Sequence, residues 1–229
     1  MSNNKDLYEN KFYSIVSYIT YLFITNFWFL VMIFPLWFYI WGAGKNISLS
    51  LVLLCSILIG PAVTALFSVM GKLVRGEDIS STKDFFHSYK INFGQAFYIA
   101  IIINALITVC YIDIGYFVSR NLMIVSYIFL AAIVILLMLS FYIYPILSRF
   151  NLGIIQIFKL AIRLGVKKVY ISLTSISMII IVLGFVKFMG ISLVGVLFGG
   201  SVICYIIMRL QKKTMDELEE ELKNKYNID

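Results

Sequence analysis

Charged residues are scarce in this chain. Of its 229 residues, 14% are Asp, Glu, Lys or Arg and 61% are hydrophobic, whereas soluble domains carry about 25% charged residues. So few charged side chains cannot cover a surface that faces water. The composition therefore excludes a soluble globular protein and a disordered chain, and it indicates a polytopic membrane protein.

Residues that bind metals or carry out catalysis are also few. The chain has one histidine, His87, and three cysteines, Cys55, Cys110 and Cys204, with no CxxC pair. A zinc site uses three or four such ligands, and an odd number of cysteines gives no disulfide framework. The sequence contains no HExxH, Walker A or GxSxG motif. We therefore expect no cofactor, no metal and no enzymatic activity.

Six stretches without Asp, Glu, Lys or Arg are long enough to cross a bilayer as helices. They are apolar on all sides, unlike the alternating strands of a membrane barrel, and only helices satisfy their own backbone groups in lipid. The predicted fold class is all-α: a polytopic transmembrane helical bundle of six spans within residues 1–208. The spans are expected at about 15–40, 47–70, 93–116, 122–147, 169–187 and 190–208. Whether the last two form a hairpin or one broken segment stays open.

The basic residues give the orientation. With six spans, all of the 19 Lys and Arg except Lys45, Arg120 and Lys187 fall on one side, which the positive-inside rule places in the cytoplasm. Both termini are then cytoplasmic. The net charge of +7 is explained by this topology and by anionic lipid, so no nucleic acid is expected as a partner.

Two loops on that side have helical apolar stripes beside basic residues, which predicts two cytoplasmic interfacial amphipathic helices. Each loop follows a span that contains a proline, so the same order of elements occurs twice. This order suggests an internal repeat. The stripes are Phe85, Tyr89 and Phe93 in the first loop, and Ile154, Phe158 and Ile162 in the second; the prolines are Pro61 and Pro145.

The tail, residues 209–229, predicts a cytoplasmic C-terminal helix. Leu218 and Leu222 share one side of it, and Glu219 and Lys223 have the spacing of an i,i+4 ion pair. It is either a solvated continuation of the last span or a docking helix for a partner.

Ionisable side chains are nearly absent inside the spans. Asn26 and Asn104 are neutral polar residues at depth, and we expect both to form hydrogen bonds between helices rather than to bind a substrate.

Four motifs occur in order along the chain: Gly60–Phe67, Lys72–Asp78, Asp84–Ala96 and Tyr144–Phe150. Together they resemble the YesL-like family of integral membrane proteins. The resemblance covers about residues 15–205. One departure is Leu160, where that family often has Asn.

The function of that family is unknown, and no catalytic residues can be carried over from it. Its members are membrane proteins of Gram-positive bacteria, frequently associated with carbohydrate ABC import systems. The resemblance therefore implies the bacterial plasma membrane, ABC permease subunits as partners, and a role as an accessory or scaffold protein of sugar import.

Two other functions stay open, namely an autonomous carrier or channel for a small solute and, with least support, an intramembrane enzyme. The motifs do not tell whether the chain forms homo-oligomers. The candidate interaction face comprises the residues of the motifs in and next to the cytoplasmic loops: Gly60, Pro61, Phe67, Arg75, Glu77, Asp78, Phe85, Phe86, Tyr89, Lys90, Asn92, Phe93, Pro145, Arg149 and Phe150.

Overall fold

The structure, a computed structural model, describes residues 2–44 and 48–226 of the chain. Over these ranges it is helical, with no strand. The helices are α1 (Ser2–Met32), α2 (Phe34–Ala43), α3 (Leu49–Ser56), α4 (Ile59–Arg75), α5 (Ser81–Ser119), α6 (Met123–Arg149), α7 (Ile154–Lys167), α8 (Val169–Phe188) and α9 (Ser192–Tyr226).

Six helical segments of the described chain are long and apolar enough to cross a membrane. This confirms the all-helical class and the six membrane-helix candidates. The candidates are Tyr13–Met32, Leu51–Arg75, Ser81–Ser119, Met123–Arg149, Val169–Phe188 and Ser192–Lys225.

The first predicted span is interrupted. α1 ends at Met32 and α2 starts at Phe34, with Pro35 in its first turn. Proline has no N–H to donate to the preceding turn, so the helix breaks just before it.

The two predicted loop helices differ. The second is the separate helix α7, whereas the first is continuous with its span in the 39-residue α5. At 1.5 Å per residue, α5 is about 58 Å long, roughly twice the thickness of the hydrocarbon core.

On both helices the face that neighbouring helices bury is rotated from most of the predicted stripe. On α5 the buried residues include Phe85, Ala96 and Ile99, while Phe93 is exposed. On α7, Ile157, Ala161 and Leu164 are buried and Ile162 is exposed.

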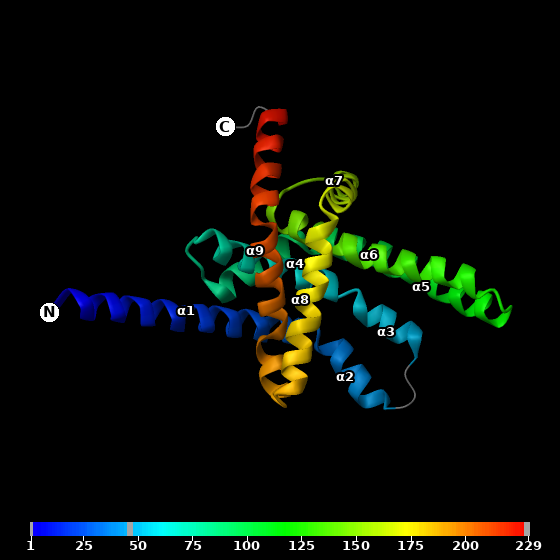
Figure 1. The fold of residues 1–229 in the computed structure, drawn as a ribbon, viewed down its shortest axis with the longest axis horizontal. Coiled ribbons are helices and arrows are strands. Elements are labelled where there is room, and N and C mark those ends of the chain that lie inside the picture. Colours follow the sequence, from blue (N-terminus) through cyan, green and yellow to red (C-terminus); the bar gives the residue numbers. More distant parts are fainter. Residues whose placement is uncertain (1, 45–47, 227–229) are drawn as a thin grey trace.

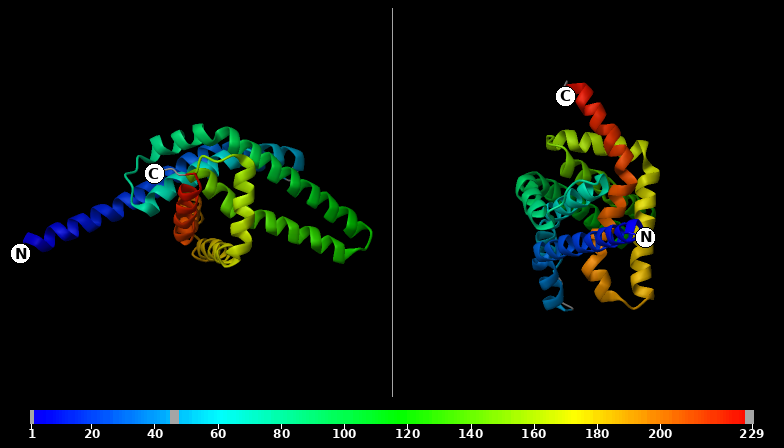
Figure 2. Two further views of the ribbon diagram at one scale, coloured as in Figure 1. Left: turned by 90° about the horizontal axis from the view of Figure 1, so that it is seen from above. Right: turned by 90° about the vertical axis from the view of Figure 1, so that its left-hand side faces the viewer.

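The helices do not form a bundle of parallel rods. α8 and α9 form an antiparallel pair that crosses the direction of α1 and of the α5–α6 hairpin (Figures 1 and 2). A tight turn joins this pair, with Gly190 at φ +65°. The six candidates therefore do not all share one direction (Figures 1 and 2).

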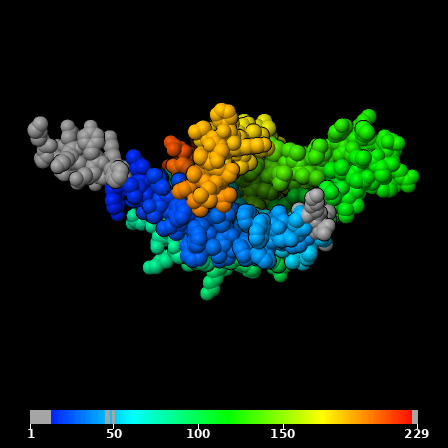
Figure 3. All heavy atoms as spheres, turned by 90° about the horizontal axis from the view of Figure 1, so that it is seen from below, coloured from blue at the N-terminus to red at the C-terminus, as the bar shows by residue number. Residues whose placement is uncertain are grey.

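α4 lies at the centre of the packing, against α1, α5, α6 and α9. Its buried residues include Leu66, Met70 and Leu73. The close approach to α5 requires Gly60, since a Cβ at this position would lie 2.7 Å from Ala100 Cβ and 2.8 Å from the Ala96 carbonyl oxygen. By contrast, the tip of the α5–α6 hairpin projects away from the other helices (Figure 3).

The expected role of Asn26 is confirmed. Its Nδ2 donates to the Val196 carbonyl at 2.8 Å, and its Oδ1 accepts from the Ser201 N–H at 3.0 Å. Asn26 is fully buried, so these bonds fix α1 against α9.

Candidate functional site

The structure brings the two motif regions together at the end of α4, the start of α5 and the end of α6. Between them lies a groove of about 240 Å³, called here the motif groove. Of the predicted residues, Asn92, Arg149 and Phe150 line it. The whole lining is Ser68, His87, Ser88, Ile91, Asn92, Leu147, Ser148, Arg149, Phe150 and Asn151.

Aromatic rings fix the start of α5 beside α1 and α4. Phe85 is fully buried and stacks on Tyr89, with ring centroids 6.3 Å apart. Phe86 meets Trp28 edge to face at 4.8 Å, and Trp28 Nε1 donates to Thr82 Oγ1 at 3.1 Å. These contacts hold one wall of the motif groove in place.

Ion pairs fix the turn between α4 and α5. Lys72 Nζ lies 2.8 Å from Asp84 Oδ1, and the other oxygen of Asp84 accepts from the Ser80 N–H at 2.9 Å. Arg75 pairs with Glu77. The hydrogen bond from Arg75 lowers the pKa of the Glu77 carboxyl, so this side chain stays charged.

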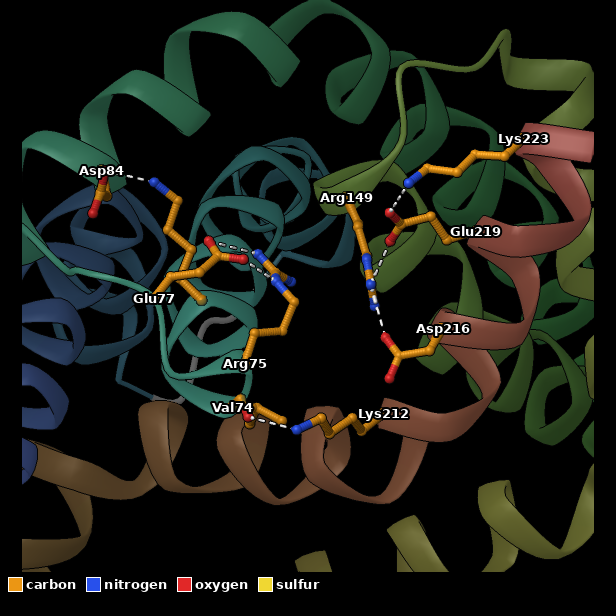
Figure 4. Close-up of polar contacts among 10 residues, drawn as sticks. Val74, Arg75, Glu77, Asp84, Arg149, Lys212, Asp216, Glu219 and Lys223 are labelled. Carbon is orange, nitrogen blue, oxygen red and sulfur yellow. Dashed lines mark hydrogen bonds and ion pairs between the residues drawn. The ribbon is translucent and has the colours of Figure 1, made fainter. Parts of the chain in front are cut away.

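Arg149 joins the end of α6 to the tail. Its side chain is 12% exposed, and its Nη2 donates to Asp216 Oδ1 at 2.8 Å and to Glu219 Oε2 at 2.5 Å. The guanidinium also lies 5.6 Å from the centre of the Phe150 ring. Figure 4 shows this cluster and the Arg75–Glu77 pair in one view.

The rest of the tail packs on the same chain. Met215 and Leu218 are buried, so the reading of the tail as a solvated continuation is wrong there. Lys168 pairs with Glu217 at 2.5 Å, and the predicted Glu219–Lys223 pair is present at 3.4 Å.

Arg163 adds a two-pronged pair with Glu221, at 2.6 and 2.8 Å. This hydrogen bonding raises the pKa of the Arg163 guanidinium. We did not predict from the sequence that the tail packs against the segment 149–168 of the same chain. A signal for it was present, because the acidic residues of the tail complement the basic residues of that segment.

A second hollow lies among α1, α4, α5, α6 and α9. It is an apolar cavity of about 420 Å³, lined among others by Gly60, Phe67 and Tyr144. Figure 3 shows one face hollowed where the first helices, α6 and the start of α9 meet. Of the cavity's polar residues, Ser56 and Ser140 donate to carbonyls of their own helices.

The remaining predicted residues are spread around these two hollows. Pro61 and Pro145 are buried in helix packing, and Lys90 and Asp78 are exposed. The fifteen residues are therefore spread over several places. Some line the motif groove or the apolar cavity, some are buried in helix packing, and others lie exposed beside the groove.

Nothing in the ranges 2–44 and 48–226 has the form of a metal centre, since no three His, Cys, Asp or Glu side chains come together there. His87 lies in the motif groove, whereas Glu77 is paired with Arg75.

Comparison with known proteins matches part of the chain to a family model. Residues 22–114 match the model of a protein family described as "Protein of unknown function, DUF624". No curated protein matches the chain, and no solved structure matches it either. The chain is thus similar to an uncharacterised domain family over the segment from α1 to α5.

Proposed function

We propose that the chain is an integral membrane accessory protein that binds a component of a carbohydrate ABC import system through the motif groove. The observation that carries this proposal is the convergence of two motifs, far apart in sequence, on one open groove. A groove with both apolar and hydrogen-bonding walls suits a peptide segment of another protein.

The groove offers mixed chemistry for such a segment. Ile91 is 65% exposed at its rim, while His87 and Asn92 provide hydrogen-bonding groups. Arg149 is already satisfied by two carboxylates, so its part is to shape the groove rather than to bind the partner.

The proposed location is the bacterial plasma membrane, with the motif groove and both termini in the cytoplasm. The excess of Lys and Arg in the loops and tail beside the groove supports this orientation. The link to sugar import rests on the sequence resemblance described above.

An autonomous carrier for a polar solute has less support. The larger cavity has no charged side chain in its lining, and sugars and ions need polar groups to replace their water. Purified chain in liposomes should therefore leave sugar flux at the level of empty vesicles.

The test is capture of partners from the native membrane of sugar-grown cells by cross-linking and mass spectrometry. The wild-type chain should capture a permease or ATPase subunit of a sugar importer. The double variant His87→Ala/Ile91→Ala should lose most of this capture, because both side chains line the groove. Ile155→Ala removes an equally exposed isoleucine from α7 and should leave the capture unchanged. Recovery of no importer subunit with the wild type would refute the proposal.

A further inference from the structure

The larger cavity has the size and the walls of a ligand site. Its volume of about 420 Å³ falls within the range of about 300–1,000 Å³ that is typical of small-molecule pockets. Phe29, Val63, Ile107 and Phe141 are among the side chains that form its apolar walls. The lining comes from helices that qualify as membrane spans, a position that suits a ligand from the lipid phase.

Two polar groups in these walls have no hydrogen-bond partner, unlike the two serines. The Tyr144 hydroxyl and the side-chain amide of Asn104 line the cavity, and the structure gives neither a partner within the described chain. Asn104 thus departs from its expected role between helices, which Asn26 performs. Unpaired polar groups in an apolar cavity favour a ligand that supplies an acceptor.

The Tyr144 hydroxyl lies beside Gly60. A Cβ on Gly60 would lie 3.5 Å from the hydroxyl oxygen, an ordinary contact distance. Asn104 follows Ala100 by one turn of α5, and Ala100 is the residue that meets Gly60. Both polar groups therefore lie in the cavity wall near the crossing of α4 and α5.

We propose that this cavity binds a glycerolipid of the membrane. One acyl chain lies along the apolar walls, and an ester carbonyl accepts hydrogen bonds from the Tyr144 hydroxyl and the Asn104 amide. The absence of charged side chains in the lining argues against a free fatty acid, whose carboxylate would need a cation nearby. This site is independent of the proposed partner groove.

Photo-cross-linking tests where the lipid lies. The full chain is placed in nanodiscs of phosphatidylglycerol that contain a trace of the same lipid with a diazirine in mid-chain. Irradiation should label Val63, Ile107 or Phe141. Labels confined to outward-facing side chains such as Val109 and Tyr127, which are 56% and 65% exposed, would overturn the proposal.

A cavity-filling variant tests whether the acyl chain occupies the apolar cavity. Val63→Phe should reduce labelling of the cavity by about fivefold or more, because the added ring occupies the place of the chain. Val109→Phe makes the same change on the outer surface of α5 and should leave cavity labelling unchanged. Equal labelling in both variants would contradict the proposal.

Tyr144→Phe tests the hydrogen bond while keeping the ring. Binding of an ester-linked lipid, measured by retention in native mass spectrometry, should fall about three- to tenfold, and binding of the ether-linked analogue should not change. Tyr98→Phe removes a hydroxyl from an outward-facing tyrosine and serves as the control. Equal loss for both lipids would rule out the carbonyl contact. Because neither variant alters the motif groove, failure here is distinguishable from failure of partner capture.

Discussion

α4 and the outer α5–α6 hairpin have similar hydropathy but opposite surroundings. In an 18-residue apolar window of each candidate, mean hydropathy is 2.3 for Leu51–Arg75 and 2.8 for Met123–Arg149, yet 44% of the first window and 6% of the second is buried within the protein. Small residues explain the difference. α4 carries Gly60, Ala62 and Ala65 at its contacts, and small residues let helix backbones approach closely. Hydropathy therefore identifies membrane helices, and small residues decide which one becomes the centre of packing.

The largest expected effect comes from one leucine in each region. Leu73 in α4 is 4% exposed and Leu130 in α6 is 49% exposed. Leu73→Ala should reduce the free energy of unfolding by about 2–5 kcal/mol, because it leaves a cavity among packed helices. Leu130→Ala should change it by less than about 0.5 kcal/mol, as is usual for surface positions. Unfolding in mixed detergent micelles with increasing SDS measures both, and equal losses would abolish the distinction between the two regions.

A glycine in each region gives a smaller and oppositely signed pair of effects. Gly60→Ala places a Cβ against Ala100 and the α5 backbone, and such overpacking costs about 1–3 kcal/mol. Gly115 in outer α5 has nothing within 4 Å of the position of a Cβ. Gly115→Ala should stabilise the helix by about 0.5–1 kcal/mol, because alanine loses less backbone entropy. The same unfolding assay applies, and a stabilised Gly60→Ala variant would show that α4 and α5 are less closely packed than described.

The sequence was sufficient for the helical class and the six membrane-helix candidates, because long apolar runs are a strong and local signal. It also predicted the interhelical role of Asn26. It did not predict that the first loop helix continues into α5, nor which face of α5 is buried. Those features depend on the contact between α4 and α5. The spacing of apolar residues within α5 does not indicate this contact.

The candidate site was predicted in pieces. The motifs pointed to Asn92, Arg149 and Phe150, which do share the motif groove. Gly60 and Phe67, which the motifs grouped with them, line the separate apolar cavity. The partners of Arg149, Asp216 and Glu219, are about 70 residues further along the chain. Only the complementary charges of the two segments hinted at this pairing.

Arg149 extends the comparison from packing to charge. The Arg149 side chain, at the end of α6, is nearly buried and pairs with two carboxylates of the tail. Arg120, at the tip of the α5–α6 hairpin, instead lies over the ring of Tyr116, 5.6 Å from its centre. Because Asp216 and Glu219 are 46% and 38% exposed, water weakens their pairing, and Arg149→Gln should cost only about 1 kcal/mol.

That loss is large enough to be seen in the tail itself. A change of about 1 kcal/mol in the docking of the tail multiplies its undocked population by about fivefold. Trypsin cleavage after Lys212 and Lys213 should accelerate by a similar factor, since proteolysis follows the open population when opening is fast. Arg120→Gln should leave the cleavage rate unchanged. If Arg149→Gln also leaves the cleavage rate unchanged, the buried side chains of Met215 and Leu218 hold the tail in place without help from charge. The sites of Arg149 and Arg120 then differ in packing alone.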